Sequence, residues 1–396
     1  MGKLIDKYRP AAASFLLMLA VSIPATALSF LNEPVSQELG VGMGSFTLYY
    51  SLMVASGALT MPVIGQMIGK IGVKKLALVC ALWAGIGFFL LSFATQLWMF
   101  YLIGIVIGIL CSAAVNLCAN VVLQTYYRTA EAASMIGIVM AGSGVGGMLF
   151  SAVMPSVLSG FGWRMSFRVL GVSWAVLIAL AMIVLGNPTP VQEKTTAANH
   201  TDGMTKAEAL RSPVLYLMLV SVFFLTFGSG ISQHLPKVIS HNGFSAEQTG
   251  VLMSLYTAVL AIGKILQGML YAKAGFRKGG ALTHIAFIAG FLLLRQMETS
   301  YPAMVLVAIG MGVLTTFVPV LSKELFGAKE YAAIYSIVAM AMSIGTFAAT
   351  PVWGFVYDLT GSYNLGLIGV SVLIGTAFVC QMTALKLRSS QKQSNS

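Results

Sequence analysis

Long runs of apolar residues, separated by short polar segments, account for most of this sequence. Twelve such runs of roughly 20 residues end at charged residues, at Gly or Pro, or at clusters of amide side chains. Each run is long enough for a helix to cross ~30 Å of hydrocarbon. They lie near 11–31, 45–68, 76–95, 98–122, 134–158, 168–186, 213–233, 249–272, 280–297, 300–322, 334–357 and 363–386. The pattern predicts an all-α membrane protein with twelve transmembrane helices.

One polar stretch divides the runs into two groups of six. It covers residues 187–212 and is the longest polar segment of the chain. We predict an N-terminal six-helix half over 1–186, a cytoplasmic linker over 187–212, a C-terminal six-helix half over 213–388 and a disordered tail over 389–396. No loop is long enough for an extramembrane module, which argues against a receptor or scaffold.

Composition agrees with this reading. The chain has 396 residues, of which 58% are hydrophobic and 9% are charged, whereas soluble globular chains carry about 25% charged residues. Such a chain cannot cover itself with a water-compatible surface. We therefore expect the lipid bilayer to surround it.

The formal net charge of +11 does not indicate nucleic-acid binding, because the basic residues are not gathered in a patch. In the twelve-span topology, 18 of the 23 Lys and Arg residues fall on the side of the N-terminus. The opposite side has Arg164, Arg168, Lys237 and Arg295, and Lys264 lies within a span. The positive-inside rule then predicts a multi-pass protein of the cell membrane with both termini in the cytoplasm.

Catalytic and metal chemistry find no support in the sequence. The four cysteines fall inside apolar runs, where they act as small hydrophobic residues. The four histidines lack metal-ligand spacing, and no nucleophile-base pair emerges. We predict no metal, no cofactor and no enzymatic activity.

The run from Gly142 to Gly147 matches the dinucleotide fingerprint G-x-G-x-x-G. That fingerprint requires a preceding strand and an acidic residue about 20 positions further on. Here the run lies inside an apolar span, and no acid follows at that distance. We interpret it as a close-packing surface between helices.

An internal repeat relates the two halves. Glycines and basic residues follow the second span and recur at the same offsets 203 residues later, after the eighth. The first copy is Gly65, Lys70, Gly72, Lys74 and Lys75, and the second is Gly268, Lys273, Gly275, Arg277 and Lys278. We expect Gly65 and Gly268 to allow close helix approach, Gly72 and Gly275 to form tight turns, and the basic residues to anchor the loops at lipid headgroups.

This repeated loop resembles the signature of the major facilitator superfamily. That signature is a Gly, three residues, Asp, Arg, one residue, Gly and two basic positions between helices two and three. Gly69 and Ala272 stand where the family usually has the acid. The resemblance spans the whole chain and implies two pseudo-symmetric six-helix bundles that form a transporter.

A finer resemblance is to the oxalate/formate antiporter and monocarboxylate transporter branch. It is carried by Phe46 to Tyr50, Ala141 to Gly147, Gly162 to Arg164 and His234 to Pro236. Members of that branch move small carboxylates and place a cationic side chain in helix eight. The resemblance implies that Lys264 binds the substrate.

Lys264 stands out on physical grounds as well, because it lies about 6 Å from the middle of the span at 249–272. An ammonium near the bilayer centre costs ~2.5–3.5 kcal/mol and normally faces a cavity or a counter-charge. The alternative is that Lys264 extends to the cytoplasmic headgroups. Against it, Tyr256, Thr257 and Gln267 share the face of this span with Lys264, which makes that face the polar one.

Other polar residues within spans complete the candidate substrate site. They are Tyr49, Tyr50, Asn116, Asn120, Ser143, Gln233 and Ser343. For each of them taken alone, the pattern favours hydrogen bonding between helices over substrate binding. No carboxylate lies well inside a span, and we interpret Glu33 and Asp358 as solvated ends of spans.

One buried cation balances one carboxylate, so we predict a secondary active or facilitative transporter of a small organic anion of the monocarboxylate type. It would work as a monomer by alternating access, with symport, antiport and facilitated diffusion all open. The alternative is a proton-driven exporter of lipophilic compounds. The 23 methionines and 22 phenylalanines could form an adaptable apolar pocket for such compounds.

Overall fold

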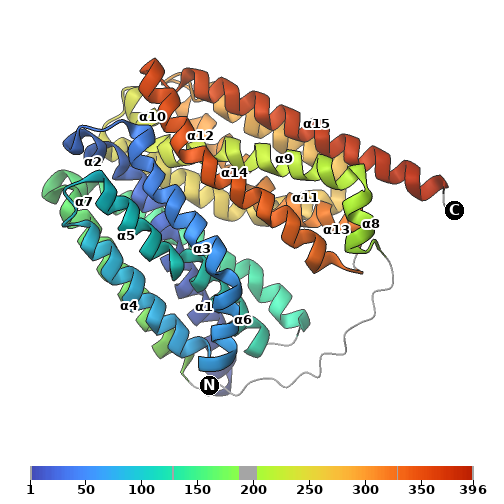
Figure 1. Cartoon of the computed structure of the whole chain (residues 1–396), viewed down its shortest axis with the longest axis horizontal. Helices are drawn as coiled ribbons and strands as arrows, with labels where there is room; N and C mark the ends of the chain where they lie inside the picture. The colour runs from blue at the N-terminus through green and yellow to red at the C-terminus, as the bar shows by residue number, and fades with distance from the viewer. Residues whose placement is uncertain (1, 127–128, 187–202, 328, 395–396) are drawn as a thin grey trace. The chain divides into compact units, whose positions relative to one another are not determined.

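The computed structural model of the chain describes residues 2–126, 129–186, 203–327 and 329–394 (Figure 1). In these residues the protein is helical, and its one β-bridge joins Gly203 to Gly327. Each of the twelve predicted spans coincides with a helical segment. The predicted all-α membrane fold is therefore confirmed.

The first half of the chain contains seven α-helices and one short 3-10 turn. They are α1 (Gly2–Thr26), η1 (Ala27–Phe30), α2 (Asn32–Leu39), α3 (Met43–Ile71), α4 (Val73–Leu91), α5 (Leu97–Ile109), α6 (Ser112–Tyr126) and α7 (Thr129–Leu185). The second half has eight α-helices, a 3-10 turn (η2) and a π-helical turn (η3). They are α8 (Lys206–Arg211), α9 (Pro213–Ser229), η2 (Gly230–His234), α10 (Leu235–His241), α11 (Ala246–Leu293), α12 (Ser300–Gly312), η3 (Val313–Phe317), α13 (Val318–Phe326), α14 (Tyr331–Thr360) and α15 (Asn364–Ser394).

Two of these helices each contain two predicted spans. Among the described residues, nine helical stretches are long and apolar enough to cross a membrane, and one of them, Ile138–Leu185, has 48 residues. At 1.5 Å per residue it is about 72 Å long, which is more than twice the hydrocarbon thickness. The backbone breaks at Gly162 in α7 and at Gly275 in α11, so each helix divides into two spans.

The two copies of the repeated loop have the same backbone conformation. Gly72 has φ 80° and ψ 157°, and Gly275 has φ 73° and ψ 168°. Residues with a Cβ rarely adopt such positive φ values, so glycine is needed at both turns. At Gly65, by contrast, a Cβ would meet no atom of the described residues within 4 Å. The expected close approach of another helix at Gly65 is therefore not found among these residues.

The chain divides into two compact units. Unit 1 contains Met1–Lys194 and Gln233–Ala261, and unit 2 contains Thr195–Ser232 and Ile262–Ser396. Both η2 and α11 therefore pass from one unit into the other. The predicted division into halves at 186 and 213 stays a prediction, and residues 187–202 of the predicted linker lie outside the described residues.

In unit 1, α7 packs against α1 and α4 (Figure 1). Glycines allow the close approach to α1: a Cβ on Gly142 would lie 2.6 Å from the Phe15 carbonyl oxygen, and one on Gly146 would lie 2.6 Å from the Leu19 carbonyl oxygen. Gly144 and Gly147 of the same run lie against the first part of α11. The interpretation of this run as a close-packing surface is confirmed.

In unit 2, α9 packs against both α14 and α15 (Figure 1). The Trp353 indole of α14 donates a hydrogen bond to the Phe227 carbonyl oxygen of α9 at 2.8 Å. The described end of the linker also belongs to this unit, where the Met204 amide donates to the Phe326 carbonyl oxygen at 2.7 Å. At the other end, α15 continues to Ser394, over part of the predicted tail.

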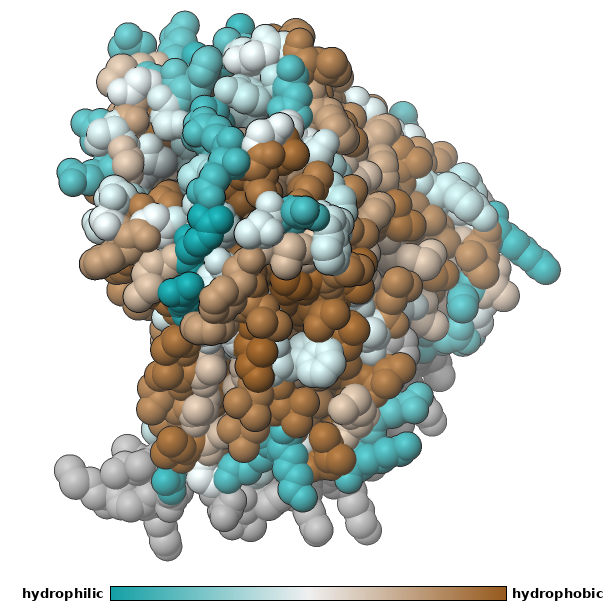
Figure 2. All heavy atoms as spheres, turned by 60° about the vertical axis from the view of Figure 1, so that its left-hand side comes forward, coloured by the Kyte–Doolittle hydropathy of each residue, from teal (hydrophilic) through white to brown (hydrophobic). Residues whose placement is uncertain are grey.

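Large apolar side chains lie on the outside of the helices. On α4 they recur every four residues at Leu78, Leu82, Ile86 and Leu90, and these four side chains are between 44% and 64% exposed. On the face drawn in Figure 2, hydrophobic side chains form a broad area, and hydrophilic ones gather above and below it. Such surfaces belong in lipid, because soluble monomers rarely expose continuous apolar patches of this extent.

Candidate functional site

Lys264 lies on the part of α11 that belongs to unit 2, and its side chain is half-buried. The strongly exposed apolar side chains around it are Ile262, Leu266 and Met269, at 59%, 57% and 52%. They are two or five residues from Lys264, which places them on the opposite side of the helix at about 100° per residue. Lys264 therefore does not share the exposed apolar side of α11.

The residues on the Lys264 side of α11 are buried. Thr257, seven residues before Lys264, and Gln267, three residues after it, are each 2% exposed, and Tyr256 is 4% exposed. Within the described residues, the Lys264 ammonium has neither an ion-pair partner nor a hydrogen-bond partner. The protein thus places an uncompensated cation on the covered side of a spanning helix.

Gln267 holds α11 to α12 within unit 2. Its amide nitrogen donates to the Ile309 carbonyl oxygen, and its amide oxygen is buried without a hydrogen-bond partner among the described residues. A Cβ on Gly312 would lie 2.5 Å from that oxygen. Gln267 therefore packs between helices and retains one buried acceptor.

A cavity of about 300 Å³ in unit 1 brings two of the predicted residues together, Tyr50 and Asn116. The Asn120 side chain donates to the Asn116 amide oxygen at 2.7 Å, which fixes the orientation of that amide. The other residues that line the cavity are Val21, Pro24, Ala25, Met53, Val54, Gly57, Gly108, Cys111 and Ser112. It is a mainly apolar chamber with a few polar groups, as is common for sites that bind small molecules.

The remaining predicted residues make contacts within their own helices or with neighbouring rings. Tyr49 is fully buried in an aromatic cluster, with its ring centroid 4.9 Å from that of Phe46. In the part of the chain that the structure describes, its hydroxyl has no hydrogen-bond partner. The hydroxyls of Thr257, Ser143 and Ser343 donate to backbone carbonyls of their own helices, those of Met253, Met140 and Ala339. These contacts satisfy hydroxyls inside spans and leave substrate binding by the three residues a prediction.

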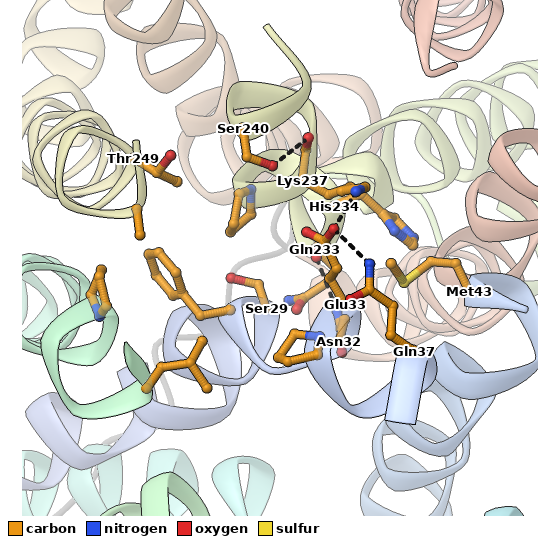
Figure 3. A pocket seen from close by; sticks show the side chains of 16 residues that line it. Ser29, Asn32, Glu33, Gln37, Met43, Gln233, His234, Lys237, Ser240 and Thr249 are labelled. Atoms are coloured by element: carbon orange, nitrogen blue, oxygen red, sulfur yellow. Dashed lines mark hydrogen bonds and ion pairs between the residues drawn. The ribbon is translucent and has the colours of Figure 1, made fainter. Parts of the chain in front are cut away.

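A second cavity in unit 1, of about 250 Å³, lies where η1 and α2 meet α10 (Figure 3). The predicted residue Gln233 lines it, and its side chain donates to the Ala25 carbonyl oxygen at 3.0 Å. Glu33 and Lys237 also line this cavity and form an ion pair. Glu33 is therefore more than a solvated residue at the end of a span. The pair could not be predicted from the sequence, because 204 residues separate its two members.

The basic residues of the repeated loops face outward. The exposed residues are Lys70, Lys75, Lys273, Arg277 and Lys278, and Lys74 is half-buried.

Among the described residues, no group of His, Cys, Asp or Glu side chains is arranged to hold a metal ion.

Apolar spans, a repeated loop and cavities between helices are the features of a multi-pass membrane transport protein. The Major Facilitator Superfamily model matches residues 11–319 and 238–396 in two overlapping segments, and the chain belongs to this superfamily. It is therefore a transporter of small molecules in a membrane and not an enzyme.

Curated relatives and solved structures agree with this assignment. The chain is 25% identical over 336 residues to the uncharacterized MFS-type transporter YhjX of Escherichia coli (strain K12), and the alignment covers 80% of each chain. It is also 25% identical to monocarboxylate transporter 12 of Homo sapiens over 359 residues, which covers 79% of this chain and 69% of the relative. These likenesses support the monocarboxylate-transporter-like branch.

In fold, the chain resembles a bacterial homolog of the human lysosomal transporter Spinster with a TM-score of 0.76 at 17% identity, covering 95% of this chain and 96% of that one. The nucleoside transporter NupG gives a TM-score of 0.75 at 15% identity, with 96% and 99% covered. At such identities the likeness concerns the fold alone.

Proposed function

We propose that this transporter moves a small organic monocarboxylate by alternating access, and that Lys264 neutralises the substrate carboxylate. The observation that carries the proposal is the position of Lys264 on α11, opposite the exposed Ile262, Leu266 and Met269. A lysine that extends to the headgroups would lie on the exposed apolar side of the helix. On the covered side, its charge calls for an anion inside the protein.

The charge of the substrate follows from this arrangement. An unpaired ammonium near the bilayer centre costs ~2.5–3.5 kcal/mol, and a bound carboxylate offsets much of this cost through charge-assisted hydrogen bonds. Because the described residues offer Lys264 no partner of their own, the substrate is the natural counter-ion. A single negative charge balances it.

The orientation that we propose follows from the basic residues. With both termini in the cytoplasm and the protein in the cell membrane, the exposed cations of both repeated loops face anionic cytoplasmic headgroups. We further propose that a monomer is sufficient for transport. Exchange, symport and facilitated diffusion are all compatible with a single substrate cation.

The test is uptake by proteoliposomes of a panel of monocarboxylates, dicarboxylates, amino acids and lipophilic cations. We expect saturable uptake of a monocarboxylate, which Lys264→Gln lowers about 10- to 100-fold and Lys264→Arg lowers less, because a charged hydrogen bond contributes about 1.5–3 kcal/mol. Lys386→Gln, at an exposed position of α15, is the matched control. Transport of lipophilic cations without any carboxylate would instead favour the exporter.

A further inference from the structure

The cavity of Figure 3 lies at one end of the first span. The chain crosses the membrane once, along α1, between its N-terminus and Glu33. The cavity is therefore on the side opposite the N-terminus, which is the outer side if the termini are cytoplasmic. A substrate arriving from outside would meet this part of unit 1 early in its path.

Three polar interactions join the two walls of this cavity. Lys237 of α10 forms an ion pair with Glu33 of α2, and the Asn32 amide donates to the Gln233 carbonyl oxygen at 3.1 Å. The Gln233 side chain reaches the Ala25 carbonyl oxygen of α1. These interactions form a tie between the end of the first span and a segment some 200 residues away.

The ion pair is only partly shielded from water. The Lys237 side chain is 18% exposed and the Glu33 side chain is 30% exposed. A second donor, the Gln37 amide, reaches the same carboxylate oxygen of Glu33 at 3.1 Å, so this oxygen is held from two sides (Figure 3). A pair of this kind can open without burying an isolated charge, because water reaches both groups.

The size of the cavity limits what it can hold. Its volume of about 250 Å³ lies below the ~300–1,000 Å³ that is usual for drug-sized ligands. Apolar side chains such as Phe30 and Leu158 make up much of the lining, and the ion pair supplies its charges. The cavity therefore suits a small molecule with one charged group better than a large lipophilic one.

We propose that Lys237 is an entrance site for the carboxylate substrate, which Glu33 occupies until a substrate carboxylate replaces it. One carboxylate takes the place of another at the same ammonium, so the charge-assisted hydrogen bonds of Lys237 are conserved during the exchange. Glu33 is released to water, the tie between α2 and α10 opens, and the substrate is admitted. This inference rests on the proposed transport of a small carboxylate.

The experiment measures how readily a cysteine in the cavity reacts from outside. Ser240→Cys places a thiol on the cavity lining. In the parent chain Cys80, Cys111 and Cys118 are buried and Cys380 is half-buried, so labelling of the parent is measured and subtracted. Proteoliposomes are treated with a membrane-impermeant thiol reagent, with and without acetate, lactate or pyruvate. Thr95→Cys, at an exposed position outside the cavity, is the control for reagent and orientation.

We expect the carboxylate that is transported to speed the labelling of Cys at position 240 about fivefold or more. Glu33→Gln removes the competing charge, so labelling is fast without carboxylate and gains little from it. Lys237→Gln behaves in the same way and also raises the KM for uptake. The two variants are independent, so the test survives if one of them fails to fold.

Three results would overturn the proposal. If carboxylates are transported through Lys264 but leave labelling unchanged, the entrance site is wrong and the proposed function stands. If Glu33→Gln speeds labelling while carboxylate has no effect on the parent, the pair is a tie but not a binding site. If acid speeds labelling and carboxylate does not, substrate exchange is not what opens the pair. If no carboxylate is transported, the proposed function itself fails.

Discussion

The Trp163 indole nitrogen lies 2.5 Å from the Oε2 atom of Glu38 and donates a hydrogen bond to it. The next residue, Arg164, forms an ion pair with Oε1 of the same carboxylate at 2.6 Å, and its guanidinium lies 4.1 Å from the centre of the Trp163 ring. Trp163 directly follows the break at Gly162. Glu38 therefore fastens α2 to the point where α7 divides into two spans.

This contact predicts a dependence of stability on pH. The hydrogen bond from Trp163, and then the hydrogen bond and charge of Arg164, lower the pKa of Glu38 below its ordinary value. A lowered carboxyl pKa contributes stability above the unfolded-state pKa, and this contribution is lost as pH falls through the folded-state pKa. Because the Glu38 side chain is 46% exposed, we expect the contribution to be less than about 1 kcal/mol.

The measurement is the Tm of Glu38→Gln and of the parent chain in detergent between pH 3.5 and 7.5. The variant should be less stable at neutral pH, and the difference should shrink toward the acid end of the series. Glu247→Gln, an exposed carboxylate on the first turn of α11, is the control and should follow the parent. A Glu38→Gln difference that stays constant over the whole range would contradict the assignment.

The glycines of α7 predict a different kind of sensitivity. A Cβ on Gly146 would lie 2.6 Å from the Leu19 carbonyl oxygen and 2.4 Å from the Ser22 hydroxyl, so Gly146→Ala must push α1 and α7 apart. We expect a loss of about 1–3 kcal/mol, read as a lower Tm. At Gly160, in the same helix, a Cβ meets nothing within 4 Å, so Gly160→Ala should be neutral or stabilising. Equal Tm losses in both variants would count against the packing argument.

The adjacent tyrosines of α3 should behave in opposite ways. Tyr50 lines the cavity with Asn116, so Tyr50→Phe should raise the KM for substrate with little effect on Tm. The hydroxyl of Tyr49 is buried without a partner, which costs about 1–3 kcal/mol, so Tyr49→Phe should raise the Tm. Kinetics and thermal unfolding of the two purified variants check this. A Tm gain in Tyr50→Phe instead would show that the roles are reversed.

The fold could be predicted from the sequence because each membrane-spanning helix is marked by its own local run of residues. Each span is a run of apolar residues, and the turns at Gly72 and Gly275 are marked by the same spacing of glycine and basic residues. The break at Gly162, where one span of α7 turns directly into the next without a loop, could not be predicted from the sequence. It depends on the direction in which the chain leaves the glycine, and composition does not encode that direction.

The candidate site could be predicted only in part, because contacts between distant segments are not marked locally in the sequence. Lys264 could be singled out because a charge inside a span is costly wherever its side chain points. The pairing of Glu33 with Lys237 could not, because both residues lie at span ends, where charges are common and partners are set by packing. Tyr49 and Tyr50 show the same limit, since adjacent residues on one helix face in different directions.

The role of Lys264 in neutralising the substrate is measured by binding a monocarboxylate and its neutral amide to the purified protein. Lactate and lactamide have nearly the same shape and differ in charge, so they isolate the contribution of Lys264. We expect the transported carboxylate to raise the Tm of the parent chain, its amide to leave the Tm unchanged, and Lys264→Gln to remove the difference. Equal stabilisation by acid and amide, or an unchanged preference in Lys264→Gln, would contradict this role of Lys264.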